Sequence, residues 1–306
     1  MEFFRIKRDL PFMRYARTTV FVSLILFAVA VAALVARGLN LNVDFTGGTV
    51  IELQFNAATP ASAIRRLLVT HHYRHARVEN YGTASKVLIR LPTRATKGKA
   101  LAVRVLRLVS ARYPGASLRS VEYVGPEVGS ELADQGALAL LFVAIGITIY
   151  LTVRFEWRFA VGAIIATIHD VVIVLGVFAL FHISFSLTVL AAVLAVLGYS
   201  VNDTVVVFDR IRENFRRMRT GTTAEVIDSA ITRTLSRTIM THLLTQMMVL
   251  SMLFLGGPVL FGFALAMTVG IVVGTYGSVL VASPIVMWLG LKREDLVARK
   301  TAEDRP

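Results

Sequence analysis

Six long apolar runs constrain this 306-residue chain more than any other feature of its sequence. A bilayer core about 30 Å thick needs about 20 mostly apolar residues for one helical crossing, and each run reaches about that length. The runs lie at residues 18–36, 135–153, 159–181, 186–208, 239–255 and 261–289. Hydrophobic residues make up 55% of the chain, more than soluble proteins carry. We therefore expect an α-helical polytopic membrane bundle with six transmembrane helices.

The first run is too long for a cleaved signal peptide and lacks a small-residue cleavage site, so we expect a retained helix. Lys and Arg in the short loops predict the orientation, because they favour the cytoplasmic side. The counts are five in residues 1–17, two in 154–158, seven in 209–238, five in 290–306, and none in 182–185 or 256–260. We expect a bacterial inner-membrane protein with both termini in the cytoplasm and residues 37–134 outside it.

The net charge of +13 raises the question of nucleic-acid binding. Most of the 33 basic residues lie in the expected cytoplasmic flanks, where anionic lipid attracts them. Membrane lipid is therefore the expected partner of these charges, and no nucleic acid is needed. The chain has no cysteine, which excludes disulfides, thiolate metal sites and a cysteine nucleophile.

Residues 37–134 interrupt the apolar pattern and predict a small folded domain between the first two helices. The pattern predicts a strand at 49–55, a helix at 60–72, strands at 76–81 and 85–91, a helix at 96–113 and a strand at 117–124. This βαββαβ order is typical of an α+β ferredoxin-like fold. The domain is either a docking surface for cargo or partners, or a basic domain without special chemistry.

Three histidines cluster in this domain, at His71, His72 and His75. Because no carboxylate or cysteine stands at ligand spacing beside them, we interpret them as surface residues and expect no metal. No motif for a bound cofactor is present either.

Residues 209–238 lie between the fourth and fifth runs and begin with a basic segment at 209–220. Thr222 and Glu225 have the spacing of a capping box, and an apolar stripe follows them. We expect a helix that lies along the membrane surface before it enters the bilayer at residue 239. It is either a hinge or an ordinary amphipathic connector.

In the last run, Gly270 and Gly274 have a small-residue spacing that allows helices to approach closely, which is a weak signal.

Ionisable residues inside apolar runs need an explanation, because each costs about 2.5–3.5 kcal/mol on insertion scales. Asp203 lies in the cytoplasmic half of the fourth run, and Arg237 opens the fifth at a similar expected depth. An arginine that moves relative to the aspartate would make Asp203 a proton switch. Asn202, Thr204 and Thr241 would add hydrogen-bonding groups along a wet path. The alternatives are a static Asp203–Arg237 pair and an Arg237 that only snorkels to the interface.

His169 and Asp170 interrupt the middle of the third run and form a second candidate pair. They either relay protons or simply neutralise each other, and we slightly favour the structural pair. The sequence suggests no partner for His242 in the fifth run. His182 lies in a short outer turn, where exposure is the expected state.

Four segments carry a resemblance to a known family. They are VDFTGGT at residues 43–49, VGPEVGSEL at 124–132, NDTVVVFDRIREN at 202–214 and TLSRTIMT at 234–241. Their order and spacing resemble the SecF family of the bacterial protein-export machinery, over roughly residues 20–290. The motif positions of the first two segments are Asp44, Gly47, Gly48, Gly125 and Pro126.

The resemblance implies an auxiliary subunit that pairs with SecD in a bundle related to the RND transporters and assists the SecYEG channel. YajC is a further candidate partner, and exported polypeptides are the cargo. The family uses the proton motive force in late steps of export and has no ATP site. The resemblance also implies proton coupling at Asp203, Arg237, Thr241 and Asn202. His242 departs from the family pattern, where a small hydroxyl residue is expected, and the acidic group of SecD is absent from this chain.

Two other functions compete with this one. An RND-type small-molecule exporter would need a large external porter domain, and the domain here has fewer than 100 residues. A purely structural membrane scaffold would tolerate neutral replacements of the buried charges. Enzymatic activity is the function with the least support from the sequence, because no nucleophile and base stand at catalytic spacing. We therefore expect that the chain is not an enzyme.

Overall fold

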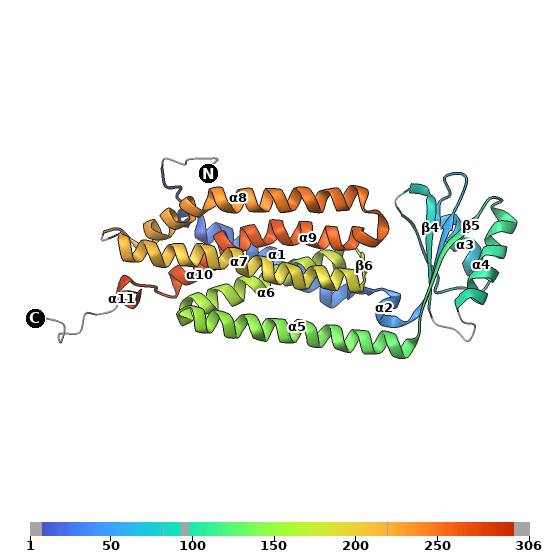
Figure 1. Ribbon diagram of the computed structural model, residues 1–306, viewed down its shortest axis with the longest axis horizontal. Coiled ribbons are helices and arrows are strands. Elements are labelled where there is room, and N and C mark those ends of the chain that lie inside the picture. Colours follow the sequence, from blue (N-terminus) through green and yellow to red (C-terminus); the bar gives the residue numbers. More distant parts are fainter. Residues whose placement is uncertain (1–7, 82, 93–97, 219, 297–306) are drawn as a thin grey trace, which may run out of the picture.

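The computed structural model describes residues 8–81, 83–92, 98–218 and 220–296. Expectations for residues 1–7, 96–97 and 297–306 lie outside the described residues. The described chain forms a long helical bundle with a small sheet domain at one end (Figure 1). The last helix, α11 (Arg293–Leu296), lies at the opposite end of the bundle.

Six helical spans in the described residues are long and apolar enough to cross a membrane, which confirms the expected polytopic bundle. Five are single helices: α1 (Ala16–Arg37), α5 (Pro126–Arg154), α6 (Trp157–Leu180), α7 (Leu187–Arg217) and α8 (Thr223–Leu255). The sixth combines α9 (Gly257–Gly277), the π-helical turn η2 (Ser278–Ala282) and α10 (Ser283–Trp288). Helices α6 and α7 form the buried centre, while α1, α5 and α8 leave most of their apolar surface open to lipid or a partner.

The expected surface helix between the fourth and fifth runs is not a separate element. Helix α8 begins at Thr223 and continues without a break to Leu255, and Thr222 and Glu225 form the predicted capping box. The apolar stripe of its first turns is buried against Phe208, Ile211 and Phe215 of α7, so it packs in the protein core. The N-terminal 3-10 turn η1 (Met13–Tyr15) covers this part of α8, and the Met13 amide donates to Asp228. Because protein already buries the stripe, the prediction of a helix lying on the membrane was wrong.

The π turn in the last span has a local cause in the sequence. Pro284 has no amide hydrogen, so it cannot donate to the Leu280 carbonyl four residues earlier. The Thr19 hydroxyl of α1 lies 3.4 Å from that carbonyl and 3.1 Å from the Ala16 carbonyl, and Ser283 Oγ donates to the Ser278 carbonyl at 3.1 Å. The proline removes one helical bond, and the Thr19 hydroxyl lies beside the carbonyl that loses it. π turns of this kind often occur at functional sites.

The sheet domain contains β2 (Gly48–Gln54), α3 (Ala61–Thr70), β3 (Arg77–Tyr81), β4 (Thr83–Leu91), α4 (Gly98–Arg112) and β5 (Ser117–Val124). Its antiparallel sheet has the order β3-β4-β2-β5, which is the predicted ferredoxin-like arrangement. Ile51 and Leu53 of β2 pack with α3 and α4 in one apolar core. Both helices lie on the side of the sheet that faces away from the bundle (Figure 1).

The chain that joins α1 to the sheet is attached to the turn between α6 and α7. Strand β1 (Asn40–Leu41) pairs in parallel with β6 (Ser184–Phe185) in that turn. In the short helix α2 (Val43–Thr46) that follows, Asp44 Oδ2 accepts a hydrogen bond of 3.0 Å from the Leu187 amide at the start of α7. A carboxylate at a helix N-terminus is favourable, because it meets unpaired amides and the positive end of the helix dipole.

The glycines of the two family motifs allow the two connections of the sheet domain to meet. Gly47 and Gly48 have φ values of 67° and 149°, which favour glycine. Gly125 caps α5, and Pro126 occupies its first turn. A Cβ atom on Gly129 would lie 2.7 Å from the Gly47 nitrogen and 3.2 Å from the Phe45 carbonyl. The sheet domain is therefore held at both of its connections against the same end of the bundle.

Candidate ion-coupling site

The candidate site is built on one face of α7. Tyr199, Asn202, Asp203 and Val206 follow one another at helical spacing, so they project toward the same side. All four line a cavity of about 240 Å³ between α7 and α8. Helix α8 contributes the opposite wall, with Arg237, Thr238, Thr241, His242 and Thr245. The cavity has room for several water molecules, since one ordered water needs roughly 10–15 Å³.

The Asp203 carboxylate is buried and bonded to two hydroxyl groups. It is 6% exposed. Oδ1 accepts a hydrogen bond from Thr238 Oγ1 at 3.1 Å, and Oδ2 accepts one from Ser278 Oγ at 2.5 Å. Ser278 opens the π turn, so three separate elements converge on this acid. Hydrogen bonds to a charged group each contribute about 1.5–3 kcal/mol, which helps to keep an acid inside an apolar bundle.

Arg237 lines the same cavity but is not bonded to Asp203. Across the described residues, no ion pair joins these two side chains, so the static pair considered from the sequence is not present in this conformation. The Thr241 hydroxyl lies 3.0 Å from the Arg237 carbonyl and 3.1 Å from the Thr238 carbonyl, and it donates to the helix backbone. Asn202 is exposed at the cavity wall. The arrangement leaves the guanidinium separate from the carboxylate within one polar cavity.

His242 has the partners that the sequence did not suggest. Its Nε2 atom lies 3.7 Å from Asp203 Oδ1, and its Nδ1 atom is hydrogen-bonded to Thr275 Oγ1 of α9. The Tyr199 ring packs against it with ring centroids 4.9 Å apart. His242 is 8% exposed. In this conformation His242, and not Arg237, is the basic group nearest to Asp203.

A second buried network surrounds Asp170 in the centre of the bundle. Asp170 Oδ1 lies 3.0 Å from His169 Nδ1, and Oδ2 accepts a hydrogen bond of 2.6 Å from Ser200 Oγ. His169 Nε2 lies 2.5 Å from Ser23 Oγ of α1. A Cβ atom on Gly277 would lie 2.8 Å from Asp170 Oδ2, so the glycine makes room for the carboxylate. An ionised Asp170 and a neutral His169 satisfy all these bonds without a further proton.

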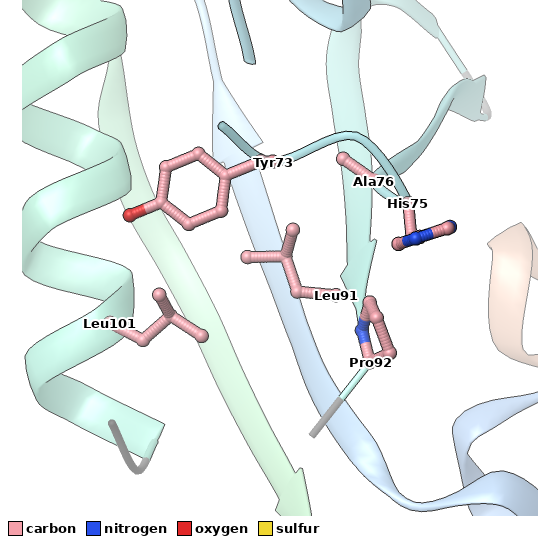
Figure 2. Close-up of a pocket in the computed structure, with 6 residues that line it drawn as sticks. All are labelled: Tyr73, His75, Ala76, Leu91, Pro92 and Leu101. Carbon is pink, nitrogen blue, oxygen red and sulfur yellow. The ribbon is translucent and has the colours of Figure 1, made fainter. Parts of the chain in front are cut away.

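The histidines of the sheet domain do not form a site with other ligands. His71, His72 and His75 are exposed, and His71 Nδ1 contacts the Leu67 carbonyl at 2.9 Å. Throughout the described ranges, no group of three or more His, Cys, Asp or Glu side chains is placed to hold a metal ion. Figure 2 shows the small pocket beside His75, whose volume of about 10 Å³ suits one water molecule.

Sequence reasoning missed several polar partners of the two acids. Thr238 and Ser278 donate to Asp203, and Ser200 donates to Asp170. Serine and threonine are common in apolar helices, so the sequence alone did not single them out. Ser200 lies three residues before Asp203, which places the two side chains near each other on α7. This spacing was a usable signal that Ser200 belongs to the polar interior of the bundle. Pro284 was a second signal, since a proline inside an apolar run predicts an irregular helix.

Two family models match the chain. The model described as "Protein export membrane protein SecD/SecF, C-terminal" matches residues 105–292, which include both buried acids and the cavity. The model described as "SecD/SecF GG Motif" matches residues 32–59, which include Asp44, Gly47 and Gly48. The two matches therefore cover α5 to α10, the end of α1 and the connection to the sheet domain.

Curated relatives and solved structures agree with the family models. The chain is 44% identical to Protein translocase subunit SecF of Pseudomonas aeruginosa, with 96% of this chain and 97% of that one covered. It is 41% identical to the subunit of the same description from Vibrio alginolyticus, with 97% and 95% covered.

The crystal structure of SecDF, described as a translocon-associated membrane protein from Thermus thermophilus, matches with a TM-score of 0.85 and 37% identity. A crystal structure of SecDF in a "Super-membrane-facing form" matches with a TM-score of 0.70 at the same identity. Each match covers 94% of this chain and only 39% of the solved chain. On this evidence the chain belongs to the SecF family of protein translocase subunits.

Proposed function

We propose that this chain works with SecD to promote late steps of protein export through SecYEG, and that the proton motive force drives these steps. Asp203 is the group that takes up and releases the proton, and Arg237, Thr241 and Asn202 complete the path. The observation that supports this most strongly is the buried Asp203 carboxylate beside a polar cavity that Arg237 also lines, with no ion pair between the two side chains in the described residues. A carboxylate that can exchange a proton for a guanidinium partner has two states of different geometry.

The energy available suffices for a conformational step. One charge that crosses the membrane gains about 2.3 kcal/mol per 100 mV, which biases an equilibrium between two helix arrangements. Movement of α7 would reach the sheet domain directly, because Asp44 and the β1–β6 pair attach that domain to the start of α7. In support, the two SecDF structures match this chain at equal identity but with different TM-scores, as expected if the same portion of SecDF takes more than one arrangement.

We place the chain in the bacterial inner membrane, with both termini in the cytoplasm and residues 37–134 on the outer side. The basic loops support this orientation. SecD is the partner with most support, because the solved SecDF chain is longer than this chain and contains its match. SecYEG, YajC and the exported polypeptide are further proposed partners. We assign no enzymatic activity, since the role proposed for Asp203 is to take up and release a proton without converting a substrate.

The direct test is export of a secreted precursor in cells whose only copy of this subunit carries Asp203→Asn. The amide keeps the shape of the side chain and accepts hydrogen bonds through its oxygen, but it cannot ionise. We expect loss of proton-dependent export while the subunit remains in the membrane and co-purifies with SecD.

Asp209→Asn is the matched control, because Asp209 lies on the same helix but is half-exposed and bonded to Arg154 at 2.8 Å. Precursor export in cells with the Asp209→Asn variant is expected to match that of the wild type. Normal export with Asp203→Asn would reject the proton switch and favour a structural scaffold.

A further inference from the structure

We propose that His242 and Asp203 share one proton, so that His242 is a second proton-carrying residue of the coupling site in this chain. This inference rests on the proposed function and deepens it, because it commits the site to protons. It concerns a residue for which the sequence alone suggested no partner.

The hydrogen bonds around Thr275 determine which nitrogen of His242 carries hydrogen in the neutral ring. The Thr275 hydroxyl has one hydrogen, and the hydroxyl donates to the Ile271 carbonyl at 2.7 Å. It therefore accepts at its other contact, which is with His242 Nδ1. On this basis we assign the hydrogen of the neutral ring to Nδ1, which leaves Nε2 with a bare lone pair.

That bare nitrogen would face the Asp203 carboxylate at 3.7 Å. If Asp203 were ionised and His242 neutral, two acceptors would lie opposite each other in a buried site, which is unfavourable. One proton removes the conflict, either on Nε2 as an imidazolium or on Asp203 Oδ1 as a carboxylic acid. The proton moves between the two atoms without other reactants, and the total charge of the pair is unchanged.

The surrounding charged and titratable groups are consistent with this assignment. Tyr199 of α7 packs on the His242 ring, and its hydroxyl lies 3.4 Å from Thr245 Oγ1. Arg237 of α8 lines the same cavity. Asp170 of α6 bonds to His169 and Ser200, so its carboxylate already has partners of its own. The cavity wall that contains His242 and Asp203 gives the shared proton an exit to water.

The two buried acid–histidine pairs differ in the number of hydrogens available for their contacts. The His169–Asp170 network is complete with a neutral ring, whereas the His242–Asp203 pair lacks one hydrogen. When the shared proton leaves, the two acceptors repel each other, and the Asp203 carboxylate becomes free to bind Arg237. This accounts for a guanidinium that lines the same cavity and, in the described part of the chain, forms no ion pair with Asp203.

The first test is nitrogen-15 NMR of the full-length chain in complex with SecD, with histidine labelled. The signals lost in His242→Gln identify the His242 ring. We expect the Nδ1–H form whenever the ring is neutral, and we expect Thr275→Val to convert it toward the Nε2–H form. Thr268→Val is the control on the same helix, because Thr268 accepts from Gln246 at 3.1 Å and does not contact the ring. A neutral ring in the Nε2–H form in the wild type would overturn the assignment.

The second test is the pH profile of proton-dependent export with His242→Thr, which restores the hydroxyl expected in the family. The pH at which export falls to half its maximum should differ between His242→Thr and the wild type, because the variant lacks the second proton-carrying group. His71→Gln, an exposed histidine of the sheet domain, should leave the profile unchanged. Superimposable profiles for His242→Thr and wild type would reject a role for His242, while a separate loss of export in Asp203→Asn would preserve the proposed function.

Discussion

Gly129→Ala tests whether the sheet domain must be held tightly against the bundle. The added Cβ would lie 2.7 Å from the Gly47 nitrogen and 3.2 Å from backbone atoms of Phe45. These neighbours are backbone, so neither can rotate away, and α2 or α5 must shift. Overpacking of this kind typically costs about 1–3 kcal/mol, and we expect the free energy of unfolding to fall by that amount.

Gly146→Ala provides the matched control in the same helix, because a Cβ there meets no atom within 4 Å. Unfolding of both variants in detergent, followed by circular dichroism across a denaturant series, measures the difference. Export measured in cells should also fall for Gly129→Ala, since the shift weakens the connection between α7 and the sheet domain. Equal unfolding and equal export for the two variants would refute the idea that this close approach holds the domain.

Three further substitutions test individual contacts. Ser278→Ala removes a donor from the buried Asp203 carboxylate and should lower stability by about 1.5–3 kcal/mol and impair export, whereas Ser251→Ala on the exposed side of α8 should change neither. Asp44→Ala removes the acceptor of the first α7 amide and should cost about 0.5–2 kcal/mol in a denaturant series; an unchanged midpoint would contradict that role. Thr19→Val removes the hydroxyl that lies 3.4 Å from the Leu280 carbonyl and should lower stability by about 1–3 kcal/mol, and an unchanged denaturation midpoint would contradict a role for this hydroxyl.

Much of the architecture was predictable, because lipid imposes strict requirements on sequence. Apolar runs of fixed length gave six spans, and period-two and helical patterns gave the βαββαβ order of the sheet domain. The prediction of a membrane-surface helix was wrong because an apolar stripe has the same pattern whether it contacts lipid or protein. Only the tertiary structure reveals that α7 buries the stripe of α8.

The candidate site was predicted in part. Charges in apolar runs are costly, so Asp203, Asp170 and Arg237 stood out from the sequence. Their partners did not, because hydroxyl residues such as Ser278 are unremarkable until a π turn directs them at a carboxylate. The nearness of His242 to Asp203 depends on how α7 and α8 pack, and a single helical pattern carries no information on such contacts.

Proton flux through the reconstituted complex tests the central claim most directly. This chain and SecD would be placed in lipid vesicles that enclose a pH-sensitive dye, and a proton gradient would be applied. We expect Asp203→Asn to reduce the flux to that of vesicles without protein, and Asp209→Asn to leave it at the wild-type level. Wild-type flux through the Asp203→Asn complex would contradict the assignment of Asp203 as the proton-carrying group.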